Sequence, residues 1–369
     1  MNQTTALSQI LKPHFPWHGS RVNFLASFII ALFQVRTVNL TELSVAFAGH
    51  SKPSSKYKRL QRFFRGFELN YSEFAQVVLR LMNIPQPWVL SLDRTNWKLG
   101  KANINFLVLG VVYQGIAFPL LWTLLNKKGN SNTDERIEFI EAFLESMKDC
   151  SIDCLVADRE FIGADGFYYL LNYPRYRFHI RLKASHHIDN GQRSLRADVV
   201  FANLRIGETR ILRGKRVLWG STAVYVSATR LEDGALLILA SSSRPKTALS
   251  DYAKRWSIET LFGILKSQGF RLEDTHITEP ERLKKLFALL TIALAWAVLM
   301  AEVQVKIEPL KLKKHGRLER SLFRYGFDTL RRIFLNWDAM TVELNQALQL
   351  LAHPGIPQPE EHSVLLSCT

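Results

Sequence analysis

Four side chains near residue 260 have a spacing that suits chemistry on phosphate groups. The offsets between them are three, four and seven residues, for Tyr252, Arg255, Glu259 and Lys266. At ~100° per residue, these offsets predict a stripe about 60° wide on one helix face. Its carboxylate can bind a metal ion while the two cations bind phosphate oxygens, as the cutting of nucleic acid requires. Taken alone, such a stripe is more typical of a solvated charged face.

Two apolar runs each end in an aspartate that is followed directly by an arginine. The first extends from Trp88 to Asp93 and the second from Ile152 to Asp158. Both predict buried strands with an acid at the C-terminal end. Ligands of open α/β sheets collect outside the carboxyl ends of the strands, so two such acids can share a metal ion. An isolated aspartate at a strand end is more often a turn former, so the surrounding elements must decide.

The elements that follow the first aspartate have a recognisable order. Residues 104–113 and 117–125 predict two antiparallel strands joined by a turn at Gln114-Gly115. An amphipathic helix comes next and ends at Met147, before the strand that ends in the second aspartate. The order strand, hairpin, helix, strand, helix, strand is that of ribonuclease H-like folds. In that order the first and fourth strands lie parallel and adjacent, so we expect the two aspartates to meet.

About a hundred residues separate Asp158 from Glu259, more than such a fold needs before its last helix. Residues 177–183 predict a fifth strand. Further strands, with an Asp-Gly hairpin turn at 233–234, predict a β-rich insertion at about 185–245. These strands are expected over residues 210–217, 222–230 and 235–241. The predicted fold is therefore α/β, with a ribonuclease H-like catalytic core, this insertion, and helical N- and C-terminal regions.

These motifs resemble those of a known family. Asp93, Asp158 and the Tyr-x2-Arg-x3-Glu-x6-Lys run from Tyr252 to Lys266 resemble the DDE triad and YREK signature of the IS-four family of bacterial insertion-sequence transposases. The likeness extends from the helical N-terminus to about Ile277, and no signature position is substituted.

The resemblance implies the roles of the signature residues. The catalytic residues and ligands of two divalent metal ions, Mg²⁺ or Mn²⁺, would be Asp93, Asp158 and Glu259. The contacts to DNA phosphates would be Tyr252, Arg255 and Lys266. It also implies two-metal phosphoryl transfer, in which water cuts the transposon end and the freed 3′-OH then attacks target DNA. Such an enzyme binds the terminal inverted repeats of its element, and its C-terminal helices pair two subunits, so a homodimer acting on double-stranded DNA is expected.

In related transposases the β-rich insertion helps to close a DNA hairpin, and a tryptophan stacks on a flipped base. The corresponding strand here, near residues 235–239, has no tryptophan. Trp219, on a neighbouring predicted strand, is the candidate for base stacking, and burial in the core is the alternative.

Composition agrees with an enzyme that acts on DNA. The 369 residues carry a net charge of +15, with a pI near 9.8, so a polyanionic partner is expected. Ribosomal or membrane-surface binding would also be basic. The apolar runs 286–301 and 24–35 are too short for a bilayer and predict buried helices, so no membrane partner is expected. Three cysteines provide no disulfide framework. We therefore expect the protein to be located in the cytoplasm of a bacterium, in association with the nucleoid.

Residues 1–83 predict a helical, basic DNA-binding domain. A short helix begins near Val38, Gly49-His50-Ser51 interrupts it, and a second helix follows with cationic first turns. This pattern fits a helix-turn-helix, and an ordinary basic helical hairpin is the alternative. The candidate DNA-binding residues are Lys52, Lys56, Lys58, Arg59, Arg62 and Arg65.

The domains expected after it are a catalytic domain at 84–277 and a helical C-terminal region at 278–369. Two other functions remain compatible with the chain. A ribonuclease H-like nuclease or resolvase needs the acids but not the YREK helix. A domesticated transposase-derived DNA-binding protein would be expected to have lost an acid.

Overall fold

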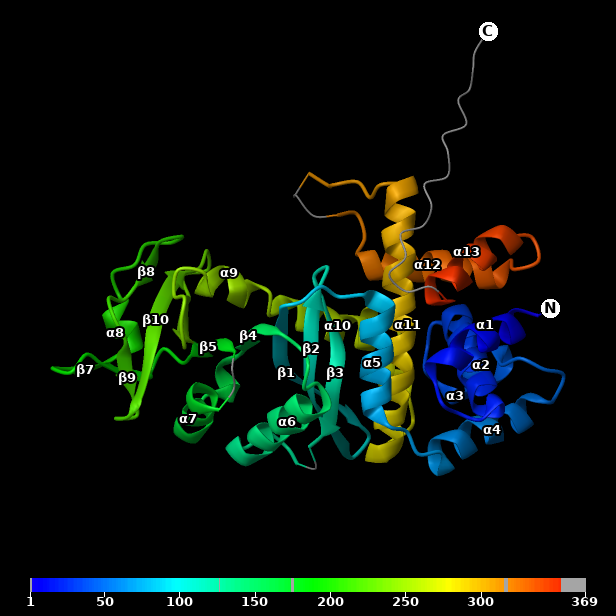
Figure 1. The fold of residues 1–369 in the computed structure, drawn as a ribbon, viewed down its shortest axis with the longest axis horizontal. Helices are drawn as coiled ribbons and strands as arrows, with labels where there is room; N and C mark the ends of the chain where they lie inside the picture. Colours follow the sequence, from blue (N-terminus) through cyan, green and yellow to red (C-terminus); the bar gives the residue numbers. More distant parts are fainter. Residues whose placement is uncertain (1, 126, 174–175, 315–317, 353–369) are drawn as a thin grey trace, which may run out of the picture.

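The computed structural model describes residues 2–125, 127–173, 176–314 and 318–352. The molecule is elongated, with a β-rich part at one end, a mixed α/β part in the middle and a helical part at the other end (Figure 1). A large sheet with helical flanks is thus the architecture, in agreement with the α/β class predicted above. Three short 3₁₀ turns connect elements, at Lys12–His14, Arg159–Phe161 and Leu272–Asp274.

Five strands in the middle part have the order β3-β2-β1-β4-β5. Their bounds are β1 Trp88–Leu99, β2 Ala102–Tyr113, β3 Ile116–Leu124, β4 Ile152–Ala157 and β5 Arg177–Leu182. β1 pairs with β4 in parallel, and Leu92 lies opposite Ala157. The residues that follow this pair, Asp93 and Asp158, therefore emerge side by side, as predicted.

β1 extends beyond its expected end. Asp93 was predicted to end the strand, but β1 continues to Leu99 because β2 pairs with it from Asp93 opposite Val108 to Leu99 opposite Ala102. The hairpin between β2 and β3 turns at Gln114 and Gly115, whose φ angles are 50° and 74°. The turn was predicted correctly, because glycine adopts positive φ without strain.

Two helices connect the parallel strands, as Figure 1 shows. α6 spans Thr133–Ser146, and α7 spans Ala164–Asn172. α6 begins with a capping box in which the Asn132 side chain accepts from Glu135 N and the Glu135 carboxylate accepts from Asn132 N, both at 2.8 Å. This cap satisfies two backbone N–H groups that have no partner inside the helix.

The β-rich part continues the same sheet, which comprises 11 strands within the described residues. β11 pairs with β5, and β10 pairs with β11. One predicted strand, 210–217, is divided in two, because the chain turns at Gly214 with φ 73°. The elements are β6 His187–Asp189, β7 Ser194–Arg196, α8 Ala197–Val200, β8 Thr209–Ile211, β9 Arg216–Leu218, β10 Thr222–Arg230 and β11 Leu236–Ser241.

Residues 2–83 consist of helices and the loops that connect them, as predicted for this region. Its aromatic core includes Phe24 and Phe63, whose rings stack with centroids 3.8 Å apart. The short and the basic helix expected from the sequence are α3 and α4. The helices are α1 Gln3–Leu11, α2 Gly19–Val35, α3 Leu40–Ala46, α4 Pro53–Gly66 and α5 Tyr71–Met82.

α11 (Pro280–Ile307) stands between the sheet and helices α1 to α4, whereas α5 lies on the sheet side of α11, next to β3 (Figure 1). It is long and apolar enough to span a bilayer, but 83% of its most apolar window is buried inside the protein, as in a core helix. α12 (Leu322–Leu335) crosses α11 very closely, since a Cβ added to Gly326 would lie 1.7 Å from Ala297 O. α13 (Thr341–Ala352) completes the helical part. The prediction that residues 286–301 form a buried helix is confirmed.

Candidate active site

The segment predicted as one helix is bent at Arg255. α9 spans Ala248–Ala253, α10 spans Trp256–Gly263, and a π-helical segment continues over Ile264–Gln268. At the junction, Arg255 N donates to Tyr252 O at 2.9 Å, a bond between residues three apart rather than four. The prediction of one regular helical stripe is therefore wrong, because a 3₁₀-like turn and a π-helical turn both change the angle per residue.

Arg255 nevertheless joins two of the three acids. Its Nη1 lies 3.0 Å from Asp93 Oδ2, and its Nη2 lies 2.6 Å from Glu259 Oε1. The Arg255 side chain is 5% exposed, and its Nε is buried without a hydrogen-bond partner among the described residues. Burial lowers the pKa of this guanidinium, but Tyr252, Glu259 and Asp93 outweigh that effect and raise it. Asp93 and Glu259 are thus separated by one guanidinium group.

Asp158 lies at the end of β4, beside the same junction. The hydroxyl of Tyr252 donates to Asp158 Oδ1 at 3.3 Å, and Arg181 Nη1 lies 3.8 Å from the same oxygen. The Arg255 guanidinium lies 5.6 Å from the centre of the Tyr252 ring. Two strands and two helices therefore bring Asp93, Asp158 and Glu259 together. We call these three residues the acid site.

The surroundings of Asp93 raise the pKa of its carboxyl group. Burial raises the pKa of Asp93 to about 6, although the backbone N–H of Arg94, which donates at 2.7 Å, and the Arg255 guanidinium lower it. The carboxyl groups of Glu160 and Asp158 also raise this pKa. Carboxylates that repel one another in a partly buried site are stabilised by a divalent cation.

The donor set of the acid site consists of carboxylate oxygens, which Mg²⁺ and Mn²⁺ prefer. In the structure the three acids do not yet form a close ligand set. The one group of three mutually close metal-type ligands among the described residues is Cys154, His179 and Asp251. The Arg255 guanidinium occupies the position of a cation between Asp93 and Glu259, and the ligand types of the acid site fit a metal ion.

Lys266 reaches β1 from the π-helical segment. Its Nζ donates to Asn96 O at 2.9 Å, lies 3.7 Å from Glu273 Oε1, and stands 5.5 Å from the centre of the Trp97 ring. Burial lowers the pKa of Lys266, and Glu273 opposes this. Lys266 is therefore beside the part of β1 that continues beyond Asp93, rather than in contact with the acids.

Sequence reasoning gave Arg181 and Trp256 no role, and it offered Arg94 either as a residue that tunes the neighbouring acids or as an ordinary sheet-edge residue. Arg94 Nη2 forms an ion pair with Glu160 Oε2 at 3.0 Å, and Arg181 approaches Asp158. Trp256 is 61% exposed, and its ring lies 5.3 Å from the Arg255 guanidinium. The signal for Arg181 was its position near the end of a predicted strand. The signal for Trp256 was a large aromatic residue inside the signature.

A second polar group lies deeper between β4, β5 and α9. We call Cys154, His179 and Asp251 the sealed cluster, because their exposed fractions are 0%, 0% and 7%. Asp251 already has two cationic partners, Lys254 at 3.0 Å and Arg177 at 3.4 Å. Cys154 is a free, buried cysteine. The cationic partners make this cluster a poor match for a metal ion, despite its ligand types.

The candidate DNA-binding residues lie on α4 or just before it. Lys58, Arg62 and Arg65 are exposed and line one hollow of about 370 Å³. Arg59 instead faces inward, where it donates to Asn23 Oδ1 at 3.3 Å and lies 5.4 Å from the centre of the Phe47 ring. The basic face of α4 is therefore made by the other basic residues of the set.

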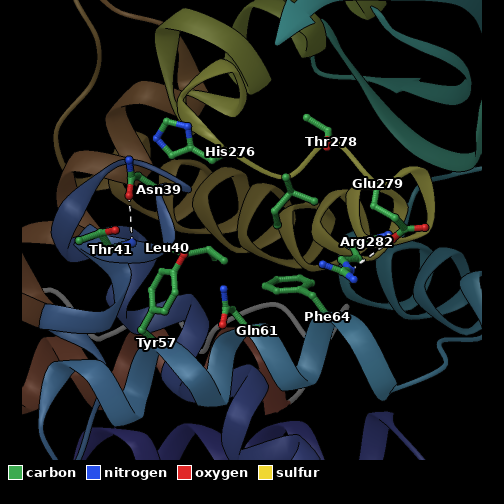
Figure 2. A pocket seen from close by; sticks show the side chains of 11 residues that line it. Asn39, Leu40, Thr41, Tyr57, Gln61, Phe64, His276, Thr278, Glu279 and Arg282 are labelled. Atoms are coloured by element: carbon green, nitrogen blue, oxygen red, sulfur yellow. Dashed lines mark hydrogen bonds and ion pairs between the residues drawn. The ribbon is translucent and has the colours of Figure 1, made fainter. Parts of the chain in front are cut away.

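Another hollow, of about 150 Å³, lies between α4 and the segment that leads into α11 (Figure 2). Tyr57, Gln61 and Phe64 of α4 face His276 and Arg282 across it. None of the acid-site residues or signature residues lines this hollow. It is thus separate from the acid site.

Trp219 occupies the turn between β9 and β10, with φ 49°. Its ring makes edge contacts with Phe167 (5.2 Å between ring centres) and His186 (5.0 Å), and the residue is 38% exposed. Trp219 is therefore neither fully buried nor free of packing.

Comparison with known proteins identifies the family. Residues 84–296 match the family model described as "Transposase DDE domain", which covers more than half of the chain. No curated protein matches the chain significantly. A cryo-EM structure of a piggyBac transposase synaptic complex with hairpin DNA is similar, with 11% identity, a TM-score of 0.43, and coverage of 91% of this chain and 78% of that chain.

The chain belongs to the DDE transposase family. It is a transposase, an enzyme of DNA transposition whose DDE chemistry depends on divalent metal ions.

Proposed function

We propose that the chain is a cut-and-paste transposase of the IS-four, or YREK, family. Its substrates are the terminal inverted repeats of an insertion sequence and then target DNA. The observation that carries this proposal is the contact of Arg255 with both Asp93 and Glu259, next to Asp158. The Arg255 guanidinium donates both to Asp93, which is 162 positions away in the sequence, and to Glu259, which is 4 positions away.

The strand order supports a ribonuclease H-like core. β3-β2-β1 form an antiparallel meander, and β4 and β5 continue it in parallel with β1. In this core the helix after the last core strand carries the third acid, as α10 carries Glu259. The strands β6 to β11 are the β-rich insertion, at about 185–245.

In the proposed site, Asp93, Asp158 and Glu259 bind two Mg²⁺ ions, or Mn²⁺. When bound, the ions activate water and stabilise the leaving 3′-oxygen. Arg255 neutralises Asp93 and Glu259 in the structure, and in the proposed DNA complex its guanidinium would instead bind a DNA phosphate. Its buried, unbonded Nε supports such a change, because one of its donors is unsatisfied in the present arrangement.

Tyr252 and Lys266 bind phosphates on either side of Arg255. Burial raises the pKa of Tyr252, so its hydroxyl stays protonated and donates to an anionic oxygen. Lys266, next to Trp97, would bind a phosphate further along the strand. Trp219 remains a candidate for stacking on a flipped base. Trp256 is a second candidate, because it is more exposed and adjoins Arg255.

The basic face of α4 supports binding of the terminal repeats. The residues proposed for this contact are Lys52, Lys56, Lys58, Arg62 and Arg65. The proposed enzyme acts as a homodimer that pairs two transposon ends in the bacterial cytoplasm, in association with the nucleoid.

The test uses the purified protein, Mg²⁺ and a plasmid that carries the coding region with its natural flanking DNA. We expect excision of the element, and its loss in Asp93→Asn, Asp158→Asn and Glu259→Gln. Asp149→Asn removes an exposed carboxylate just before β4, at the other end of this strand from Asp158, and serves as the matched control. Cleavage of branched junction DNA without excision would instead favour the nuclease or resolvase. Undiminished excision by the three variants would refute the assignment of the acids.

A further inference from the structure

Four arginines that no motif accounts for converge where α2 meets α12. Arg36 caps the C-terminus of α2, with φ 61°. Arg271 follows the π-helical segment, with φ 52°. Arg324 and Arg331 lie seven residues apart on α12 and thus on one face of it. We call these four residues the arginine cluster.

Contacts between neighbouring residues bring the cluster together. Val38 N donates to Phe270 O at 3.1 Å, which places Arg271 next to the end of α2. The Phe270 ring packs against Phe323 and Phe327 of α12, with ring centres 5.4 and 5.8 Å apart. Arg331 Nε donates to Gln34 O at 3.2 Å, two residues before Arg36. Three segments far apart in the sequence therefore contribute to the cluster.

The cluster has more positive than negative charge. Asp328 pairs with Arg324 at 2.8 Å, and Asp274 accepts a hydrogen bond from Thr37. In the part of the chain that the structure describes, Arg36 and Arg271 have no acidic partner within 4.0 Å, and Arg36 Nε is buried without a partner. Burial lowers the pKa of Arg36, and the charges of the three other arginines lower it further, against Asp328.

Like charges that are partly buried together destabilise a protein unless an anion neutralises them. A guanidinium group matches the oxygens of a phosphate better than an ammonium group does, because it donates two parallel hydrogen bonds. Four such groups from three segments suit a series of phosphates rather than a single small anion.

We propose that the arginine cluster binds the phosphate backbone of double-stranded DNA, as a site separate from both α4 and the acid site. This inference rests on the proposed function, which supplies the DNA. Its place in the chain supports it, because Arg271 lies five residues after Lys266 and the cluster therefore adjoins the proposed phosphate-binding signature. The cluster thereby ties the N-terminal helices, the signature segment and α12 to one DNA molecule.

The experiment measures binding of a fluorescein-labelled duplex of arbitrary sequence by anisotropy, over a range of salt concentrations and with EDTA present. The variant is Arg36→Gln/Arg271→Gln, in which glutamine tolerates the left-handed backbone no worse than arginine does. Lys148→Gln removes an exposed charge between α6 and β4, outside the arginine cluster, and is the matched control. Thermal unfolding verifies that every variant is folded.

We expect the double variant to bind roughly tenfold more weakly per arginine at about 0.1 M salt, and the slope of log K against log salt to decrease by about two. Lys148→Gln should leave both unchanged, and Asp328→Asn, which removes the acid, should tighten binding. A double variant whose slope equals that of Lys148→Gln would refute the cluster.

Since EDTA removes metal, the result does not depend on cleavage. If the arginine cluster does not bind DNA, the wild-type enzyme should still excise the element. If instead the proposed function is wrong, the protein should fail to excise the element although it still binds DNA through the cluster.

Discussion

The acid site and the sealed cluster adjoin each other at β4 and α9, yet they differ in charge balance. Asp158 follows Cys154 by four residues, and Tyr252 directly follows Asp251. In the acid site three carboxylates face the guanidinium groups of Arg255 and Arg181. In the sealed cluster Asp251, with its neighbour Asp153, faces the two cations Arg177 and Lys254.

This difference separates the site that we propose for chemistry from a cluster that contributes to stability. An excess of carboxylates raises the free energy of the protein alone, and binding of metal ions lowers it. The charges of the sealed cluster are balanced without a metal ion, and their contacts join α9 to β4 and β5. Ligand types alone would have favoured the sealed cluster as the metal site, because cysteine, histidine and aspartate are all common ligands.

The largest effect should separate the two sites by activity. Asp158→Asn should reduce strand cleavage roughly a thousandfold or more, since metal-ion stabilisation is worth several kcal/mol. Asp251→Asn, assayed at a temperature where it stays folded, should retain most cleavage. The measurement is the single-turnover rate of end cleavage with Mg²⁺. Equal losses of cleavage in both variants would contradict the assignment of catalysis to the acid site alone.

The next effect should separate them by stability. Asp251→Asn leaves Arg177 and Lys254 without their shared carboxylate, and loss of one partner of a buried pair costs about 3 kcal/mol or more. Asp158→Asn should be close to neutral, or stabilising, because it relieves repulsion between acids. Denaturant unfolding of both variants, with Asp149→Asn as the control, measures this. A stable Asp251→Asn protein would contradict the anchoring role.

Arg255 offers a sharper test of the acid site. Arg255→Gln should bind Mg²⁺ or Mn²⁺ about tenfold more tightly, because the competing cation is gone. Its cleavage rate should nevertheless fall, because the phosphate contact is also gone. Calorimetric titration with metal, in the absence of DNA, gives the first quantity. Weaker metal binding would show that Arg255 does not compete with the ions.

The smallest effect concerns pH and the sealed cluster. Burial lowers the pKa of His179 from 6.5 to about 4, with Arg177 and Lys254 adding to the effect and Asp251 opposing it. Between pH 6.5 and about pH 4, His179 binds a proton more readily in the unfolded chain than in the folded protein. The stability contributed by neutral His179 is therefore lost as the pH falls from 6.5 towards about 4. His179→Gln should flatten the decrease of the melting temperature in this range, whereas exposed His50→Gln should not.

Much of the fold followed from periodicity and turn chemistry. The hairpin at Gln114-Gly115 and the parallel pairing of β1 with β4 were predicted correctly, because local residue preferences and the order of elements determine them. The bend at Arg255 was not, because α-helical offsets cannot indicate where a 3₁₀-like or π-helical turn occurs. The division of the strand predicted at 210–217 depended on one left-handed residue, Gly214.

The sequence by itself determined which residues carry acids, cations and aromatic rings, and it placed Asp93, Asp158 and the signature in the order of a known family. Only the tertiary structure decided that Arg255 lies between Asp93 and Glu259, that Arg59 faces the core, and that Cys154 meets His179 and Asp251. The reason is physical: residue types and periods are local, whereas charge balance and burial arise from groups that folding brings together from distant parts of the chain.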